Sequence, residues 1–327
     1  MADDAPEFRS PNPPPFGRQR ETEGGIFFLR IALLPLLLFN AFVWGVSWWP
    51  FRQLNSLGLH ALWATGCAFG CAALLISLWR PSTWRDVLAS PGLCWLMVAS
   101  GMANIGFNWG MLVGEVVRVV LLFYLMPVWA APLARWLLGE PITALTVARI
   151  VMAVSGAAIV LYEPGLGMPV PSSLADWLGL VGGIAFAGVN VLLRYNTAER
   201  DSARVLAMFA GAGLLATLLA ATMTAAGVIA PPPPPAPLWI AGAIGLAIVA
   251  LAANLSLQYA AARLPASVTV LVMLSEVVFA AVSASWFAGE ALVTRTLIGG
   301  AMIVLAAALA ALVPPAATAP AGRQASA

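Results

Sequence analysis

One carboxylic acid, Glu276, lies deep inside an apolar stretch that runs from residue 264 to residue 288. At 1.5 Å per residue in a helix, its position corresponds to a depth of about 18 Å, near the middle of a membrane. An acidic or basic residue at that depth costs roughly 2.5 to 3.5 kcal/mol, so it should face a cavity or a partner. Desolvated carboxyl groups can exchange a proton in the physiological range. We predict that Glu276 binds a cation or a proton; the alternative is a hydrogen-bonded glutamate that fastens adjacent helices.

Side-chain amides recur at a spacing of four residues inside other apolar stretches. Asn104 and Asn108 form one pair, and Asn254 and Gln258 form another. Each pair projects from one face of its helix, so the four amides are predicted to line one cavity. Uncharged donors and acceptors suit a zwitterionic or hydroxylated ligand. The alternative is hydrogen bonding between helices. Two further amides extend the predicted set, with the same alternative: Asn40 and Asn190.

Two aromatic side chains are predicted to stack on or cap a ligand. Trp44 precedes a predicted turn at Gly45, beside the polar Ser47, and Tyr124 lies three residues before Pro127, which is expected to kink its helix. The remaining tryptophans are predicted to face lipid or to form the aromatic belt of the membrane interface.

The sequence lacks the patterns of metal sites and of hydrolytic or ATP-driven enzymes. Its three cysteines, Cys67, Cys71 and Cys94, have no metal-ligand spacing, and His60 is its one histidine. Gly-x-Ser-x-Gly, His-Glu-x-x-His and Walker A motifs are absent. We therefore predict no catalytic residue, no metal and no cofactor, and a protein that is not an enzyme; an intramembrane enzyme is the alternative from another class.

The elements that must position these residues are membrane-spanning helices. The composition is 61% hydrophobic and 9% charged, with a mean hydropathy of +0.91, whereas about a quarter of the residues in a soluble domain are charged. Sixteen basic against fourteen acidic residues leave no basic surface for nucleic acid. Apolar stretches of about 20 residues predict ten transmembrane helices. Their expected ranges are 27–49, 58–79, 91–112, 114–138, 142–162, 175–195, 203–228, 238–260, 264–288 and 292–313.

The distribution of arginines predicts that both termini are cytoplasmic. With the amino terminus inside, twelve arginines fall in or beside inner segments, and only Arg52, Arg118 and Arg295 fall outside; Arg149 is not counted because it lies within the fifth predicted span. Residues 1–26 are acidic and proline-rich without a signal-peptide pattern, and they are predicted to form a disordered cytoplasmic tail. Residues 314–327 form the second predicted tail.

The third to fifth predicted spans repeat as the eighth to tenth at an offset of 150 residues. Ala103-Asn104 recurs as Ala253-Asn254, and Gly139-Glu140 recurs as Gly289-Glu290; the Gly-Glu pairs are interpreted as turns. A weaker match, at a different offset, pairs residues 44–47 with residues 187–190. Because the copies lie five spans apart, they cross the membrane in opposite directions. This predicts an all-α membrane protein with a 5+5 inverted-topology repeat around a central cavity. The two five-helix units would be 27–162 and 175–313, joined by an outward linker, 163–174.

Several short motifs, taken with this spacing, resemble a known family. Pro127-Val128-Trp129, Leu138-Gly139-Glu140, Gly289-Glu290 and Trp44-Gly45 are similar to those of EamA-type transporters in the drug/metabolite transporter superfamily, over about residues 30 to 313. The resemblance implies a 5+5 fold with a central cavity and export of amino acids, amines or related small metabolites. One departure is Glu276-Val277, where the family often has Glu-Pro, so the proline hinge of the ninth span is missing.

These observations predict a secondary-active transporter that exports amino acids or related small organic metabolites by alternating access, with proton coupling left open. Its partners would be a small-molecule substrate and membrane lipid, with a homodimer left open and no nucleic acid. The bacterial-type inner membrane is the expected location. The alternatives are an uncoupled facilitator, a channel or a lipid scramblase.

Overall fold

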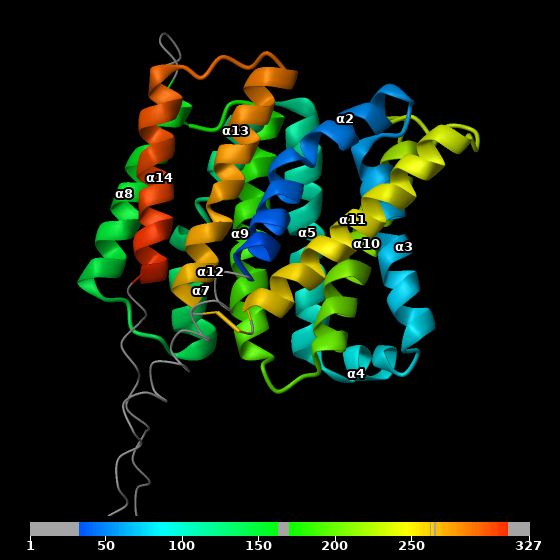
Figure 1. Ribbon diagram of the computed structural model, residues 1–327, viewed down its shortest axis with the longest axis horizontal. Helices are drawn as coiled ribbons and strands as arrows, with labels where there is room; N and C mark the ends of the chain where they lie inside the picture. Colours follow the sequence, from blue (N-terminus) through cyan, green and yellow to red (C-terminus); the bar gives the residue numbers. More distant parts are fainter. Residues whose placement is uncertain (1–32, 163–169, 262, 265, 313–327) are drawn as a thin grey trace, which may run out of the picture.

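The computed structural model describes residues 33–162, 170–261, 263–264 and 266–312, and every regular element in these ranges is a helix (Figure 1). Residues 33–46 form the first described helix. The helices that follow are α2 (Trp48–Ser56), α3 (Ala61–Trp79), α4 (Thr83–Ala89), α5 (Pro91–Val113), α6 (Val116–Phe123), α7 (Met126–Leu138), α8 (Ala144–Leu161), α9 (Leu174–Tyr195), α10 (Asp201–Ala225), α11 (Pro237–Ala261), α12 (Ala266–Met273), α13 (Ser275–Phe287) and α14 (Thr294–Leu312). The predicted tails 1–26 and 314–327 and most of the predicted linker 163–174 lie outside the described residues.

Among the described residues, eight helices are long and apolar enough to cross a membrane. They are Leu33–Ser56, Ala61–Trp79, Pro91–Val113, Val116–Leu138, Ala144–Leu161, Leu174–Tyr195, Asp201–Ala225 and Pro237–Ala261. Two shorter apolar helices follow, Leu271–Phe287 and Thr294–Leu309. The chain is therefore a multi-pass membrane protein, and its all-helical class is confirmed for the described residues. The count of ten spans and their 5+5 arrangement stay predictions.

The fourth predicted span is broken in its middle. Helix α6 ends at Phe123 and α7 begins at Met126, so Tyr124 and Leu125 form the break. Pro127 lies in the first turn of α7, where its missing N–H and fixed φ are tolerated. In the interior of a continuous helix, the same residue would remove a backbone hydrogen bond and clash with the preceding turn.

The ninth predicted span is broken at the equivalent place. Helix α12 ends at Met273 and α13 begins at Ser275, so the break falls at Leu274, which is 150 residues after Tyr124. No proline causes this break. The Ser275 hydroxyl instead donates to the Val272 carbonyl oxygen (2.6 Å), and a side-chain bond of this kind competes with the helical pattern. The missing proline therefore does not remove the interruption of the helix.

The turn predicted at Gly45 lies two residues later. The first helix continues through residue 46, and Ser47 forms the turn, where both its N–H and its hydroxyl donate to the Trp44 carbonyl oxygen (3.2 and 2.8 Å). Gly45 stays helical because the helix packs there directly on α13: a Cβ at Gly45 would lie 2.7 Å from the Glu276 carbonyl oxygen.

Small residues bring the central helices together. Helix α9 packs along α5, and a Cβ at Gly106 of α5 would lie 2.7 Å from the Gly182 Cα of α9. Figure 1 shows α8 beside α14 at one edge, α5 and α9 in the middle, and α3 with α10 at the other edge. One buried cluster centres on α6 and the helices around it, and a second lies between α3, α5 and α10.

Candidate functional site

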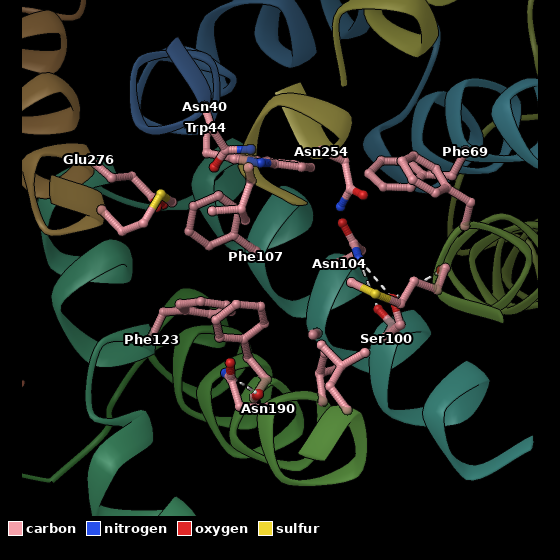
Figure 2. A pocket seen from close by; sticks show the side chains of 18 of the residues that line it. Asn40, Trp44, Phe69, Ser100, Asn104, Phe107, Phe123, Asn190, Asn254 and Glu276 are labelled. Atoms are coloured by element: carbon pink, nitrogen blue, oxygen red, sulfur yellow. Dashed lines mark hydrogen bonds between the residues drawn. The ribbon is translucent and has the colours of Figure 1, made fainter. Parts of the chain in front are cut away.

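A cavity of about 190 Å³ lies among the central helices (Figure 2). The first helix, α3, α5, α6 and the break after α6 supply one part of its wall, and α9 to α13 supply the other. Both predicted repeat units therefore contribute to the cavity. Its lining residues are Asn40, Trp44, Phe69, Ser100, Ala103, Asn104, Phe107, Phe123, Tyr124, Phe186, Val189, Asn190, Leu193, Met208, Phe209, Asn254, Leu257, Met273 and Glu276.

Seven of the nine predicted site residues belong to this lining: Asn40, Trp44, Asn104, Tyr124, Asn190, Asn254 and Glu276. Asn108 and Gln258 do not. Asn108 is fully buried and donates from Nδ2 to Thr65 Oγ1 (3.1 Å), and Gln258 Nε2 donates to Asn254 Oδ1 (2.7 Å). A spacing of four residues keeps two side chains on one face but advances about 6 Å along the helix. That advance moves each of these two residues beyond the cavity.

The hydrogen bonds of the asparagines decide which atoms they can offer to a ligand. Asn104 Nδ2 donates to the Ser100 carbonyl oxygen (2.9 Å), and Asn190 Nδ2 donates to the Phe186 carbonyl oxygen (2.8 Å). The side-chain oxygens of both residues are therefore available to accept a hydrogen bond from a ligand. Asn40 Nδ2 donates to the Ala253 carbonyl oxygen (2.7 Å), and its fully buried Oδ1 accepts no hydrogen bond from the described residues.

Asn254 has the opposite polarity. Its Oδ1 accepts the hydrogen bond from Gln258, so its Nδ2 is the group left for a ligand. Figure 2 shows the ends of Asn254 and Asn104, which are partners in the 150-residue repeat, pointing toward one another. The amide oxygens of Asn104 and Asn190 and the amide nitrogen of Asn254 therefore line the cavity, whereas the Asn40 oxygen is buried away from it.

Glu276 and Tyr124 join the two helix breaks. The Tyr124 hydroxyl donates to Glu276 Oε2 (2.9 Å), and both side chains are buried. Tyr124 forms the break in the fourth span, and Glu276 lies in the first turn of α13, directly after the break in the ninth. The amino-terminal end of a helix has a partial positive charge that favours a carboxylate. The acid is thus held by one hydroxyl and one helix end, at the point where the two breaks meet.

Aromatic rings form much of the remaining wall. The Phe107 and Phe123 centroids lie 4.8 Å apart, and Phe123 and Phe186 lie 5.1 Å apart. Trp44 lies 6.2 Å from Phe69. These spacings are those of favourable aromatic pairs and give the cavity broad apolar faces. Within the described ranges, no three His, Cys, Asp or Glu side chains come close enough to hold a metal ion.

The model of the EamA-like transporter family matches residues 31–162. These residues are similar to that family, which is part of the drug/metabolite transporter superfamily. The family consists of membrane transporters of small molecules, and the helical architecture fits such a protein.

The chain also resembles a solved structure whose title is "Crystal structure of protein", with a TM-score of 0.51 and 18% identity. The similarity covers 86% of this chain and 96% of the other. At this identity the likeness shows the fold alone. No curated protein matches the sequence.

The sequence interpretation missed several residues that line the cavity. Phe69, Phe107, Phe123 and Phe186 look in the sequence like any apolar residue that faces lipid or a neighbouring helix. Ser100 had a usable signal, since it lies one helical turn before Asn104, and its hydroxyl donates to the Met208 carbonyl oxygen (2.9 Å).

Proposed function

We propose that this protein is a secondary-active carrier that exports small organic amines, amino acids included, by alternating access and in exchange for protons. The observation that carries the proposal is the cavity, where a buried glutamate and the amide oxygens of Asn104 and Asn190 face a wall of aromatic rings.

The polarity of the lining supports an amine as the recognised group. Ammonium groups donate hydrogen bonds and do not accept them, and Glu276, Asn104 and Asn190 each offer an oxygen to the cavity. No lysine or arginine is present among the described lining residues, so a carboxylate would find no cation there and only uncharged N–H donors, such as those of Asn254 and Trp44. The apolar body of the solute would lie against Trp44 and the phenylalanines. An amine without a carboxylate is therefore expected to bind more tightly than the corresponding amino acid.

The broken helices support alternating access. Discontinuous helices around a central site are a recurrent feature of secondary transporters, because a break lets each half of a span reorient. Here the breaks at Tyr124 and Leu274 are related by the repeat offset, and both lie beside the cavity.

Proton exchange would use the same carboxylate as solute binding. Tyr124 stabilises Glu276 by a hydrogen bond, and a proton or an ammonium group can satisfy the remaining oxygen. A site that holds one or the other exchanges solute for protons. Transport experiments distinguish this carrier from an uncoupled facilitator, a channel or a scramblase.

The test uses purified protein in liposomes. Preloaded unlabelled amine should drive transient accumulation of labelled amine, which a channel or scramblase does not produce. A pH gradient should accelerate transport by the parent protein. Transport by Glu276→Gln should have the same rate with and without the gradient. Glu115→Gln is the matched control, since Glu115 is exposed and outside the cavity, and it should behave as the parent. Protein-free liposomes correct for passive partition of amines.

Two outcomes would contradict the proposal. Absence of counterflow for a panel of amines and amino acids would exclude the carrier, and an unchanged rate and pH profile in Glu276→Gln would exclude proton exchange at Glu276. Tighter binding of amino acids than of the matched amines would refute the argument from lining polarity.

A further inference from the structure

Each of the two Gly-Glu turns of the repeat holds an arginine from the other predicted repeat unit. Glu290 pairs with Arg52 (Nη2 to Oε1, 3.4 Å), and Glu140 pairs with Arg194, which donates to both carboxylate oxygens. We propose that these two ion pairs are reciprocal gates of the cavity, one at each end of the bundle. The proposal rests on the alternating access argued above and names the residues that control it.

The two turns have the same backbone structure. Gly139 and Gly289 are left-handed, with φ of 71° and 67°, a conformation that glycine adopts without strain. The Glu140 N–H donates to the Ala134 carbonyl oxygen, and the Glu290 N–H donates to that of Ala284, again at the 150-residue offset. Because the turns match, each presents its glutamate in the same way at the end of a broken span.

The two arginines also have related positions. Arg52 follows Trp44 by eight residues, and Arg194 follows Ala187 by seven, where Trp44 and Ala187 begin the weaker repeat match. Arg52 lies on α2, which continues the first span, and Arg194 lies in the last turn of α9. Each arginine therefore extends from the first span of its unit to the Gly-Glu turn of the other unit.

The two pairs lie at opposite ends of the molecule. Helix α2 lies at the upper end of the bundle, and the connection from α9 to α10, beside Arg194, lies at the lower end (Figure 1). The cavity lies between them. Opening either end by moving one unit away from the other must break the ion pair at that end, whereas the pair at the other end can stay formed.

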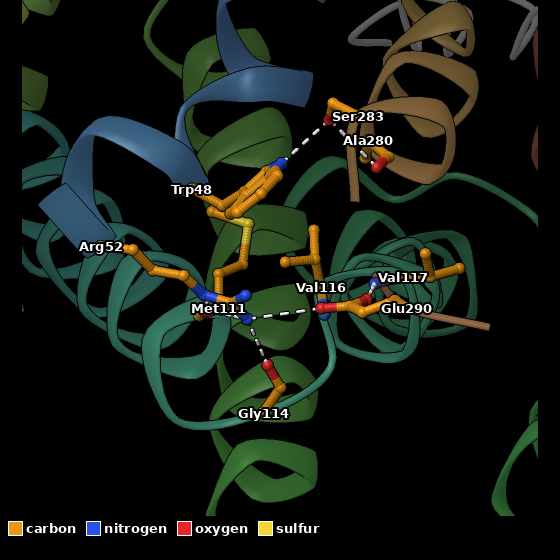
Figure 3. Close-up of polar contacts among 9 residues, drawn as sticks. All are labelled: Trp48, Arg52, Met111, Gly114, Val116, Val117, Ala280, Ser283 and Glu290. Atoms are coloured by element: carbon orange, nitrogen blue, oxygen red, sulfur yellow. Dashed lines mark hydrogen bonds and ion pairs between the residues drawn. The ribbon is translucent and has the colours of Figure 1, made fainter. Parts of the chain in front are cut away.

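The Glu290 pair is anchored by additional hydrogen bonds to the backbone (Figure 3). Arg52 also donates to the carbonyl oxygens of Met111 (3.1 and 3.2 Å) and Gly114 (2.9 Å). Glu290 also accepts hydrogen bonds from the N–H groups of Val116 (3.0 Å) and Val117 (3.4 Å), which begin α6. The two side chains thus hold the turn between α5 and α6 from both sides.

The Glu140 pair is exposed and has no comparable set of backbone bonds. The Arg194 side chain is 53% exposed, against 27% for Arg52. Exposed ion pairs stabilise little because water and salt screen them. Loss of the Glu140 pair should therefore shift the conformational equilibrium less than loss of the Glu290 pair.

The ion pair between Arg118 and Asp176 also joins the two units but has a different role. Asp176 is fully buried, and its carboxylate accepts hydrogen bonds from the N–H groups of Ser172 and Ser173 in the capping box of α9. It fixes the Gly-rich contact between α6 and α9, and the repeat offers no counterpart at the other end. We assign it to stability and not to gating.

The experiment measures access to the cavity from each side of the membrane. Ser100→Cys, an almost isosteric change, introduces a thiol into the lining, and a charged, membrane-impermeant thiol reagent is applied to right-side-out and to inside-out vesicles. The same chain without the Ser100 change gives the background of the three native cysteines. The ratio of the two labelling rates then reports which end is open.

The gates predict opposite shifts of this ratio. Glu290→Gln should raise labelling from the Glu290 end about fivefold relative to the Glu140 end, and Glu140→Gln should shift the ratio about twofold in the opposite direction, because one population grows at the expense of the other. Glutamine at position 290 keeps one oxygen, which can still accept the shorter hydrogen bond, from the Val116 N–H (3.0 Å), so the turn retains its main contact with α6. Glu115→Gln, at the Glu290 end, and Asp201→Asn, at the Glu140 end and paired within its own helix, are the controls and should not shift it.

A second variant separates gating from damage to the fold. Arg52→Gln should shift the ratio as Glu290→Gln does, and the double variant should add little, since both remove the same interaction. Shifts of both glutamate variants in the same direction, or shifts no larger than those of the controls, overturn the proposal. The labelling needs no substrate, so the two proposals can fail separately. Counterflow with an unchanged labelling ratio would support the carrier and overturn the gates. Opposite shifts of the ratio without counterflow would support the gates and overturn the carrier.

Discussion

Replacement of Gly45 by alanine should loosen the contact between the first helix and α13. A Cβ at Gly45 would lie 2.7 Å from the Glu276 carbonyl oxygen, 2.7 Å from Phe279 Cβ and 3.1 Å from the Ala280 nitrogen. Two of these atoms are backbone and cannot rotate away, so the helices must separate by roughly half an ångström. Overpacking of this kind costs about 1–3 kcal/mol, which exceeds the roughly 1 kcal/mol that alanine gains over glycine in a helix.

Gly70→Ala is the matched control for this prediction. No atom lies within 4 Å of a Cβ at Gly70 in α3, so alanine should stabilise the protein there by about 0.5–1 kcal/mol. Thermal unfolding of both variants in the same detergent measures the difference, which should be at least about 1 kcal/mol. A Gly45→Ala protein as stable as Gly70→Ala would refute the close packing of the first helix on α13. Because the contact is with the carbonyl group of Glu276, transport should fall together with stability.

Three further predictions concern charges and amides. Asp176→Ala, which leaves an arginine of α6 without its buried carboxylate, should lower the free energy of unfolding by about 3–5 kcal/mol, against less than about 0.5 kcal/mol for Asp201→Ala, whose side chain is 79% exposed. Asn104→Ala should raise the half-saturating amine concentration about tenfold, since it removes a charge-assisted hydrogen bond, whereas Asn108→Ala should lower stability and leave that concentration unchanged. Burial lowers the pKa of His60, whose Nδ1 caps α3. The resulting stability is therefore present above the unfolded pKa of about 6.5 and lost as the pH falls through the folded value, so between pH 7 and pH 5 the parent should lose more of its free energy of unfolding than His60→Asn, as thermal unfolding measures.

The depth and the polarity of residues were predictable from the sequence because both follow from the apolar pattern. The length of the stretch around Glu276 placed this residue near mid-membrane, and the structure has it buried in the cavity wall. Helical periodicity also separated Asn104 from lipid. It did not fix how far along the axis the cavity extends, and so it could not distinguish Asn104 from Asn108.

Contacts between the two predicted units could not be read from the sequence. The bond from Tyr124 to Glu276 and the pair of Arg52 with Glu290 join residues 152 and 238 positions apart. The repeat related the two Gly-Glu turns to each other but gave no partner for either, so both were interpreted as turns alone. Local pattern predicts the shape of a turn, whereas its ion-pair partner depends on how the helices pack.

The two helix breaks differ in what their covalent structure permits. Pro127 has no N–H and a fixed φ, so α6 and α7 cannot form one regular helix in any conformation of the protein. Val277 stands at the corresponding place in the ninth span and has both a free φ and a donor, which here bonds to the Leu274 carbonyl oxygen (3.2 Å). The ninth span can therefore form a straight, uninterrupted helix, whereas the fourth cannot. Amide hydrogen exchange can follow the break after Leu274 at its own N–H groups, while Pro127 has no amide hydrogen to report on the other.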